Sequence, residues 1–242
     1  MEGIHRTVPC EQGDIAYLLE QKPVKNLNLR IRTDGSVYVS ANPEVPLHRV
    51  DEFVFSKRDY ISASKKKFAQ MIANEPKPKQ YVSGETFYLL GHGLRLKVEQ
   101  KEKEAVFSDG AYIFLQVKDT SDFKKKERLM TRYLNTESQK AFEEIMTEIY
   151  PIFEKYGIAR PELRLRNMET RWGTCLPGKG IVTLNKRLIE VPRDGIEYVV
   201  MHEFCHFIHP NHSKRFYTLL TTLMPDWKQR KDMLEKWAVY EV

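Results

Sequence analysis

The sequence has few cysteines and no long hydrophobic run. Three cysteines, Cys10, Cys175 and Cys205, occur in 242 residues, and their odd number and irregular spacing exclude a scaffold built from disulfides. No stretch approaches the roughly 18 unbroken apolar residues that cross a membrane, and the opening MEGIHRTVPCEQGD lacks the apolar core of a signal peptide. The sequence therefore predicts a cytoplasmic protein without a membrane partner.

A strong charge of one sign is also absent. The chain carries 39 Lys and Arg against 33 Asp and Glu, a net charge of +6, so its surface is mixed and only moderately basic. Two lysine runs, at 65–67 and 124–126, are typical of solvated helix faces, with contact to nucleic acid or phosphate as the second interpretation. No internal repeat and no low-complexity tract stands out. These properties favour a globular protein of one large or two small domains.

The first 119 residues have the pattern of a β-rich domain. Between residues 27 and 39, apolar and polar positions alternate on both sides of Asp34-Gly35, which predicts a hairpin. Residues 47–72 repeat apolar side chains at helical spacing, and the proline-containing segment 75–80 then ends that helix. Three more strands are expected between residues 86 and 117, separated by glycine turns. We expect an antiparallel β-rich domain with one helix.

The composition changes near residue 120. A long charged helix is expected from about residue 121 to Gly157, followed by strands at 163–167 and 181–185. Helical spacing returns from residue 193 to the histidines that follow, and two further helices are expected after them. The predicted fold class is therefore α+β, with an N-terminal domain over 1–119 and a helical C-terminal domain with a small sheet over 120–242.

Four of the seven histidines lie between residues 202 and 212. His202 and His206 are four residues apart, so on a helix both imidazoles share one face about 6 Å apart and can hold one ion. Glu203 follows the first of them directly. This pattern, H-E-x-x-H, is typical of sites in which two histidines bind zinc and the glutamate acts as general base on a metal-bound water. Zn²⁺ is thus the expected cofactor, with Mn²⁺ or Ni²⁺ as alternatives.

A catalytic zinc usually takes three protein ligands, so a third ligand is required. On a continued helix His209 would lie roughly 7 Å along the axis from the midpoint of the first pair, too far for a shared ion. Pro210 disfavours helical dihedrals at His209, so we expect the helix to end there. Pro210-Asn211 is a turn signal that can bring His212 back to the metal. The residues favour His212 over a glutamate or histidine from elsewhere in the chain.

Such a site can attack an amide or a phosphate. The metal would lower the pKa of its bound water, and Glu203 would take the proton and deliver it to the leaving group. A further donor is needed to stabilise the transition state or contact the substrate, and the candidates are His209, Arg171 and Tyr217. Sequence spacing does not choose among these three.

The remaining histidines and cysteines have simpler interpretations. Three histidines are expected to be ordinary surface or core residues, namely His5, His48 and His92. Cys205 is predicted to be a small core residue. Cys175 is interpreted as a packing residue, with a position near the metal as the alternative. A metal-bound water makes a cysteine nucleophile unnecessary, so neither cysteine is predicted to be catalytic.

Several stretches of the chain resemble one known family. The run M-E-T-R-W-G-T-C at 168–175, the I-V-T-L-N run that ends at Asn185, and the run from Ile196 to Phe216 around the histidines look like the YgjP-like metallopeptidase family. That family is related to the SprT and WLM zincin domains. The Asp-Gly hairpin and the stretch Y-V-S-G-E-T-F-Y-L-L-G resemble its N-terminal half, so the likeness covers most of the chain.

The resemblance implies a zincin-like C-terminal domain, with a small sheet whose edge strand lies over a helix carrying His202, Glu203 and His206. It also implies that His212 is the third metal ligand. Where such families have W-G-S-C, this chain has W-G-T-C, which keeps the hydroxyl. His209 stands where metzincins need glycine, so membership of the metzincin clan is not implied.

Three substrate classes remain open. A zinc peptidase acting on a peptide or protein is the main hypothesis, and it predicts a groove beside the strand at 180–185 in which an extended chain adds as a strand. A hydrolase of a nucleotide or another phosphorylated small molecule predicts that Arg171, Lys186 or Arg187 converge on the metal. A DNA-associated, SprT-like protease predicts salt-dependent nucleic-acid binding through the β-rich half. A structural zinc module is disfavoured because it would not need Glu203.

Overall fold

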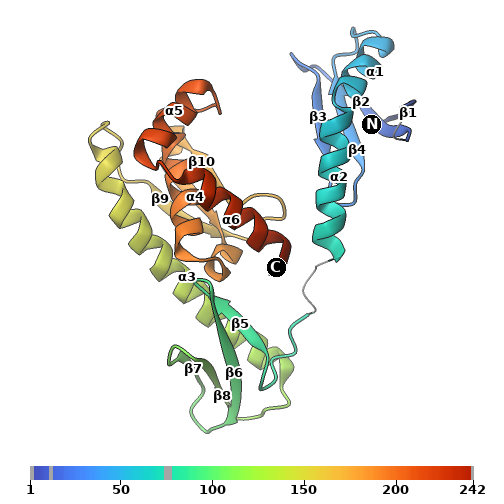
Figure 1. Ribbon diagram of the computed structural model, residues 1–242. Helices are drawn as coiled ribbons and strands as arrows, with labels where there is room; N and C mark the ends of the chain where they lie inside the picture. Colours follow the sequence, from blue (N-terminus) through green and yellow to red (C-terminus); the bar gives the residue numbers. More distant parts are fainter. Residues whose placement is uncertain (1–2, 11–12, 74–77, 241–242) are drawn as a thin grey trace. The chain divides into compact units, whose positions relative to one another are not determined.

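The computed structural model describes residues 3–10, 13–73 and 78–240 (Figure 1). The chain forms two compact units, Met1–Pro76 with Ala238–Val242, and Lys77–Trp237. Helices occur together with small sheets, so the predicted α+β class is confirmed. The predicted limit between residues 119 and 120 falls inside the second unit and stays a prediction as a domain boundary. None of the helices within the described ranges has the length and apolar character that a membrane crossing requires.

The first unit contains a four-stranded sheet. Its strands are β1 (Ile4–Val8), β2 (Ile15–Gln21), β3 (Asn28–Ile31) and β4 (Val37–Ala41), in the order β1-β2-β4-β3. The predicted Asp34-Gly35 turn joins β3 to β4, and Gly35 has the positive φ of +80° that such a turn requires. The alternating apolar residues of the strands form a buried core with the helices that follow.

The predicted helix at 47–72 is divided into two. Helix α1 (Leu47–Ser56) and helix α2 (Arg58–Ala73) are separated at Lys57, whose φ of −101° and ψ of 7° lie outside the helical region. The Lys57 N–H bonds to the Val54 carbonyl three residues back (3.0 Å), so the chain tightens at this residue. Residues 75–77 of the segment expected to end the helix lie outside the described ranges.

A second sheet repeats the topology of the first. Its strands are β5 (Thr86–Leu89), β6 (His92–Gln100), β7 (Ala105–Ser108) and β8 (Tyr112–Val117), in the order β5-β6-β8-β7. In both sheets the outer pairs are antiparallel and the central pair, β2 with β4 or β6 with β8, is parallel. An Asp-Gly turn directly precedes β4 in the first sheet and β8 in the second. In each sheet this strand is the last in chain order, and the next regular element is a helix.

The expected antiparallel arrangement of these sheets is therefore wrong, because both sheets are mixed. The same four-stranded topology occurs twice, followed by two helices in the first copy and by one helix in the second. Alternation of apolar and polar residues reports only which face of a strand is buried. It is the same beside a parallel and an antiparallel neighbour, so the pattern could not reveal the central pair.

Helix α3 (Phe123–Glu154) contributes to two cores of the second unit. Asp122 caps its first turn by accepting a hydrogen bond from the Lys125 N–H (2.9 Å). The first half of α3 buries Met130 against the β5–β8 sheet, and the second half buries Phe142 in the core of the histidine-carrying module. Figure 1 shows α3 extending from the sheet to that module.

The lysine runs are only partly solvated faces. Lys126 is buried, and Lys125 forms an ion pair with Glu104 (2.7 Å), so the interpretation of the second run as a solvated face is wrong for two of its three residues. In the first run, Lys66 is exposed and Lys65 is partly buried. The side chain of Lys67 lies outside the described ones.

The histidine-carrying module combines a three-stranded sheet with three further helices. The strands β9 (Glu162–Arg166), β10 (Gly173–Leu176) and β11 (Ile181–Asn185) lie in the order β10-β11-β9. Two short 3₁₀ turns, η1 (Pro177–Lys179) and η2 (Lys186–Glu190), flank β11, and the helices are α4 (Arg193–Cys205), α5 (Lys214–Leu223) and α6 (Trp227–Tyr240).

Because β11 is the central strand of this sheet, a substrate cannot add as a strand beside residues 181–185. The predicted groove at that strand is therefore wrong, and β10 is an edge strand among the residues that the structure describes.

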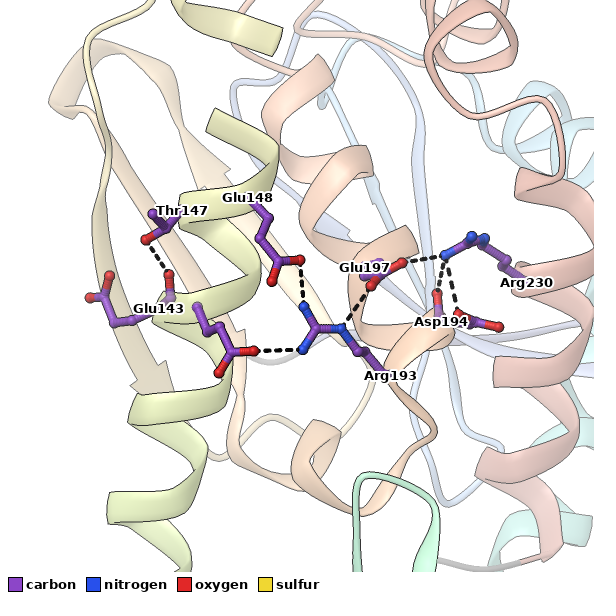
Figure 2. Close-up of polar contacts among 8 residues, drawn as sticks. Glu143, Thr147, Glu148, Arg193, Asp194, Glu197 and Arg230 are labelled. Carbon is purple, nitrogen blue, oxygen red and sulfur yellow. Dashed lines mark hydrogen bonds and ion pairs between the residues drawn. The ribbon is translucent and has the colours of Figure 1, made fainter. Parts of the chain in front are cut away.

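Two arginines connect α4 to its neighbouring helices. Arg193, in the first turn of α4, bonds to Glu144 (2.9 Å) and Glu148 on α3. It also bonds to Glu197 (2.9 Å), which accepts a second bond from Arg230 of α6 (2.6 Å), as Figure 2 shows. The side chains of Glu197 and Arg230 are only 23% and 21% exposed, so water screens this pair less than a surface pair. The network fixes the start of α4, at the opposite end from the histidines.

Replacing Glu197 by Gln is expected to lower the free energy of unfolding by about 1–2 kcal/mol, because two guanidinium groups lose their shared carboxylate. Urea denaturation followed by circular dichroism measures the change. Glu162→Gln is the control, since Glu162 pairs with Arg164 (2.7 Å) where the side chains are 58% and 55% exposed. No measurable change is expected for this control, and an equal loss in both variants would contradict the role given to the network.

Candidate metal centre

Helix α4 ends inside the histidine motif. Its last residue is Cys205 and its cap residue is His206, so the predicted helix end at His209 is wrong. The N–H groups of the two residues after His206 bond to carbonyls three residues back (both 3.1 Å), which closes the helix with a tight turn. His206 keeps helical dihedrals (φ −68°, ψ −19°) and therefore stays on the face of His202.

Three imidazoles converge just beyond the end of α4. The possible ligand nitrogens of His202, His206 and His212 all lie within 4.8 Å of one another, and the Nε2 atoms of His202 and His212 are 2.9 Å apart. Ser213 caps α5 by accepting a bond from the Phe216 N–H (3.4 Å), directly after the returning histidine. The Phe216 ring packs against all three imidazoles, with centroid distances of 4.9, 4.7 and 4.9 Å. The chain reversal predicted from Pro210-Asn211 thus brings the three rings together.

Different contacts hold the rings of His206 and His202 in place. The Nδ1 atom of His206 lies 3.2 Å from the carbonyl oxygen of His209, so it carries the proton and leaves Nε2 as the ligand atom. The buried Nδ1 of His202 has no hydrogen-bond partner among the described residues. Ring packing holds His202 instead, against Tyr198 (5.8 Å between centroids) and Phe216 (4.9 Å).

The donor set suits a divalent metal such as zinc. Burial, and then the neighbouring His206 and His212, lowers the pKa of His202 to about 3. Burial also lowers the pKa of His206. The neutral imidazole is the form that binds a metal, so both rings are held in their ligand form at neutral pH. Three nitrogen ligands are the number that a catalytic zinc takes from a protein.

Glu203 is a buried carboxylate in the same site. The residue is 6% exposed, and burial raises the pKa of its carboxyl to about 7 against the opposing effect of Arg171. Gly173 of β10 packs directly against it, since a Cβ added at residue 173 would lie 2.8 Å from both Cγ and Oε1 of Glu203. Sequence reasoning missed this role of the W-G-T-C stretch, although a glycine within a strand often marks a close approach.

Glu203 and the three histidines line one cleft of about 580 Å³. Its walls come from Arg171 to Cys175 in and before β10, from Tyr198 on α4 and from Leu234 on α6. Of the three basic residues expected to converge in a phosphate hydrolase, Arg171 lines this cleft, and Lys186 and Arg187 do not.

The candidates for substrate contact occupy different positions. Arg171 lines the cleft, whereas His209 and Tyr217 are not among its lining residues. The backbone carbonyl of His209 accepts a hydrogen bond from the ring of His206, a proposed ligand. The Tyr217 ring stacks on His212, a proposed ligand, and on Trp227, with centroid distances of 6.2 and 5.5 Å. Direct contact of any of these side chains with a substrate stays a prediction.

Tyr198 is a residue of the cleft that was not predicted there. Tyr198 precedes His202 by one helical turn, and this spacing could have indicated that it shares the face of the histidine. Burial raises the pKa of its phenol, which therefore stays protonated. Cys175 packs against the core of the module, as predicted, and it also lines the cleft, as its alternative interpretation expected. Burial, and secondly Glu203, raises the pKa of the Cys175 thiol to about 12, which excludes a reactive thiolate at neutral pH.

The simpler predictions for the other residues hold. Cys205 is fully buried in the core of the module. All three cysteines are free of disulfides. Three histidines are exposed, as ordinary surface residues would be, namely His5, His48 and His92.

One known protein family matches most of the chain. A family model described as a YgjP-like metallopeptidase domain matches residues 25–237. Among solved structures, the chain is similar to the metallopeptidase zymogen abylysin of Pyrococcus abyssi, with 19% identity, a TM-score of 0.35, and coverage of 39% of this chain and 92% of that chain. No curated protein matches the chain.

His212→Ala is expected to weaken zinc binding by at least roughly 100-fold, because loss of a supporting partner alone costs 10- to 100-fold in metal sites. Competition with a chromophoric chelator measures the affinity. His209→Ala is the matched control, because it removes a nearby imidazole but keeps the carbonyl that bonds to His206. Its affinity is expected to stay within a few-fold of wild type. Equal weakening in both variants, or none in His212→Ala, would exclude this ligand set.

Proposed function

The chain belongs to the YgjP-like metallopeptidase family, and on that premise we propose that it is a zinc-dependent peptidase with Glu203 as its general base. The observation that carries the proposal is one cleft lined by three converging imidazoles and a buried carboxylate. A structural zinc site would not need this carboxylate, and it would usually complete its ligand set with another cysteine or histidine. The group of possible ligands among the described residues contains only His202, His206 and His212.

The protein residues would divide the chemistry among themselves. The bound metal supplies a Lewis acid that activates water and polarises the scissile carbonyl. Glu203 accepts a proton from the attacking water and returns it to the leaving amine. A carboxyl whose pKa is raised to about 7 by burial is suited to both transfers. A cation held by the three histidines would shift Glu203 toward the carboxylate form that the first transfer needs.

An extended substrate would lie along β10. Among the described strands, β10 pairs with β11 on one side only, so its outer edge can accept another strand. Thr174 and Cys175 of β10 line the cleft. A peptide added at this edge would gain main-chain hydrogen bonds while it passes Glu203. In this proposal, β10 has the role that was predicted for the strand at 180–185.

The other substrate classes have less support. A nucleotide carries several phosphate charges, which proteins usually bind with clustered cations or with helix N-termini. Of the three cations expected for that chemistry, only Arg171 lines the cleft. Salt-dependent nucleic-acid binding by the β-rich half stays a prediction.

Replacing Glu203 by Gln is expected to reduce cleavage of a fluorescently labelled unstructured protein such as casein by roughly 100-fold or more, since general-base catalysis contributes about that much. The zinc content, measured by mass spectrometry, should not change, because Glu203 is not a proposed ligand. Glu162→Gln serves as the surface control and should keep full activity. Undiminished cleavage by Glu203→Gln, or by wild type stripped of metal, would exclude the proposed chemistry.

Gly173→Ala tests the placement of Glu203 separately. The added Cβ would meet Glu203 at 2.8 Å, so the carboxylate must shift, and a displacement of about 1 Å can cost roughly 100-fold in rate. We expect cleavage to fall by about 10- to 100-fold with zinc content unchanged. Gly178→Ala is the control, because a Cβ added there meets no atom within 4 Å. Full activity in Gly173→Ala would mean that the position of Glu203 does not limit the reaction.

A further inference from the structure

Arg171 is a cation in the cleft without an ion pair among the described residues. It is exposed and lines the cleft that holds the three imidazoles. By contrast, Arg193 and Arg230 of the same unit are engaged by the carboxylate of Glu197. Arg171 acts on Glu203 through its charge but forms no ion pair with it, so its guanidinium can pair with an anion that a ligand brings.

Asn185 holds the backbone at Arg171. Asn185 is 3% exposed, and its Nδ2 donates to the carbonyls of Met168 (2.7 Å) and Arg171 (2.8 Å). Its backbone N–H donates to the carbonyl of Trp172 (2.8 Å). The loop before β10 is thus held at three carbonyls by the last residue of β11. The Oδ1 atom of Asn185 accepts a hydrogen bond from the Arg187 N–H (3.2 Å), so both ends of the side-chain amide are bonded.

An amide side chain has the chemistry that this position requires. The NH₂ group of Asn185 offers two donors to two carbonyl acceptors, and its oxygen accepts one N–H. An aspartate would offer no donor to the two carbonyls, and an apolar side chain would leave them unsatisfied. Because the backbone at Arg171 is already fixed, binding needs to order only its side chain, which lowers the entropic cost of recognition.

The charge of the cleft limits which anion can bind. Glu203 disfavours a second carboxylate in the cleft unless a cation neutralises it. The planar guanidinium of Arg171 matches the two oxygens of a carboxylate. Peptides bring carboxylates from Asp and Glu side chains and from the chain terminus. Resting on the proposed peptidase function, we propose that Arg171 determines specificity by binding a carboxylate of the peptide substrate and that Asn185 is its positioning residue.

Matched fluorogenic peptides test this assignment on the full, zinc-loaded chain. One series compares Glu with Gln at each position around the scissile bond, and the other compares a free C-terminal acid with its amide. The first series reports a side-chain carboxylate and the second reports the chain terminus. For wild type we expect kcat/KM to favour the carboxylate member of one series by about 10- to 100-fold, as a bidentate charged pair would give.

Variants separate recognition from positioning. Arg171→Gln is expected to bring the ratio of kcat/KM for the carboxylate peptide to kcat/KM for its amide partner to about one. Arg171→Lys is expected to keep part of this preference, because an ammonium retains the charge but cannot form two parallel hydrogen bonds to a carboxylate. Asn185→Ala is expected to raise KM for the carboxylate peptide with little change in kcat and no change in KM for the amide peptide. Arg164→Gln is the matched control. This arginine lies on β9 and pairs with Glu162, so the wild-type ratio should be kept.

Two results would overturn the proposal, namely equal kcat/KM values for both members of every pair with wild type, or an unchanged ratio in Arg171→Gln. If urea denaturation finds Asn185→Ala unfolded, the Arg171 variants decide the outcome, because they change an exposed side chain. Fluorescence anisotropy of the same peptides with Glu203→Gln measures the preference without catalysis. A carboxylate preference in binding, with no cleavage by wild type, would reject the peptidase function and keep the carboxylate site.

Discussion

The candidate metal centre depends on the burial of helix α4. Nine of its 13 residues are buried, and it contacts α3, α5, β10 and β11, so the helix has no broad solvent face. Burying the carboxylate of Glu203 is unfavourable because the charged form loses water, and this raises its pKa. The unfavourable burial is offset by the apolar packing of the helix and by the ion-pair network around Arg193 and Glu197. The same burial keeps the pKa of His202 low and its ring neutral.

Three local features turn this buried helix into a site. The tight last turn of α4 keeps His206 on the face of His202 while it releases the chain to return. The missing side chain of Gly173 lets β10 approach Glu203. The amide of Asn185 holds the loop that leads into β10. Each feature acts on the backbone and adds to the packing of Phe216 against the three imidazoles, so both backbone geometry and ring contacts position the chemical groups.

The sequence predicts those parts of the site that depend on residues close together in the chain. The spacing of His202 and His206 and the turn at Pro210-Asn211 are enough to bring three imidazoles together, and Glu203 follows from the motif. The helix end could not be placed, because the tight turn after His206 depends on packing as well as on the proline. The roles of Gly173 and Asn185 depend on which strand lies beside α4, and that neighbour is set by long-range pairing. For the same reason, alternation in the strands predicted the sheets but not their parallel central pairs.

The four-stranded sheet packs against its helices differently in the two copies. The first sheet forms one core with α1 and α2. The second packs on α3, whose other half lies in the core around α4. Its β5–β6 turn also donates hydrogen bonds from Leu90 (2.6 Å) and Gly91 (3.2 Å) to the carbonyls of η2 just before α4, and a Cβ at Gly91 would lie 2.8 Å from Pro192. The change of composition near residue 120 therefore marks the start of a helix that two cores share. Loss of the second sheet would remove packing from α3 and hydrogen bonds from η2, which directly precedes α4, so this sheet supports the site without lining it.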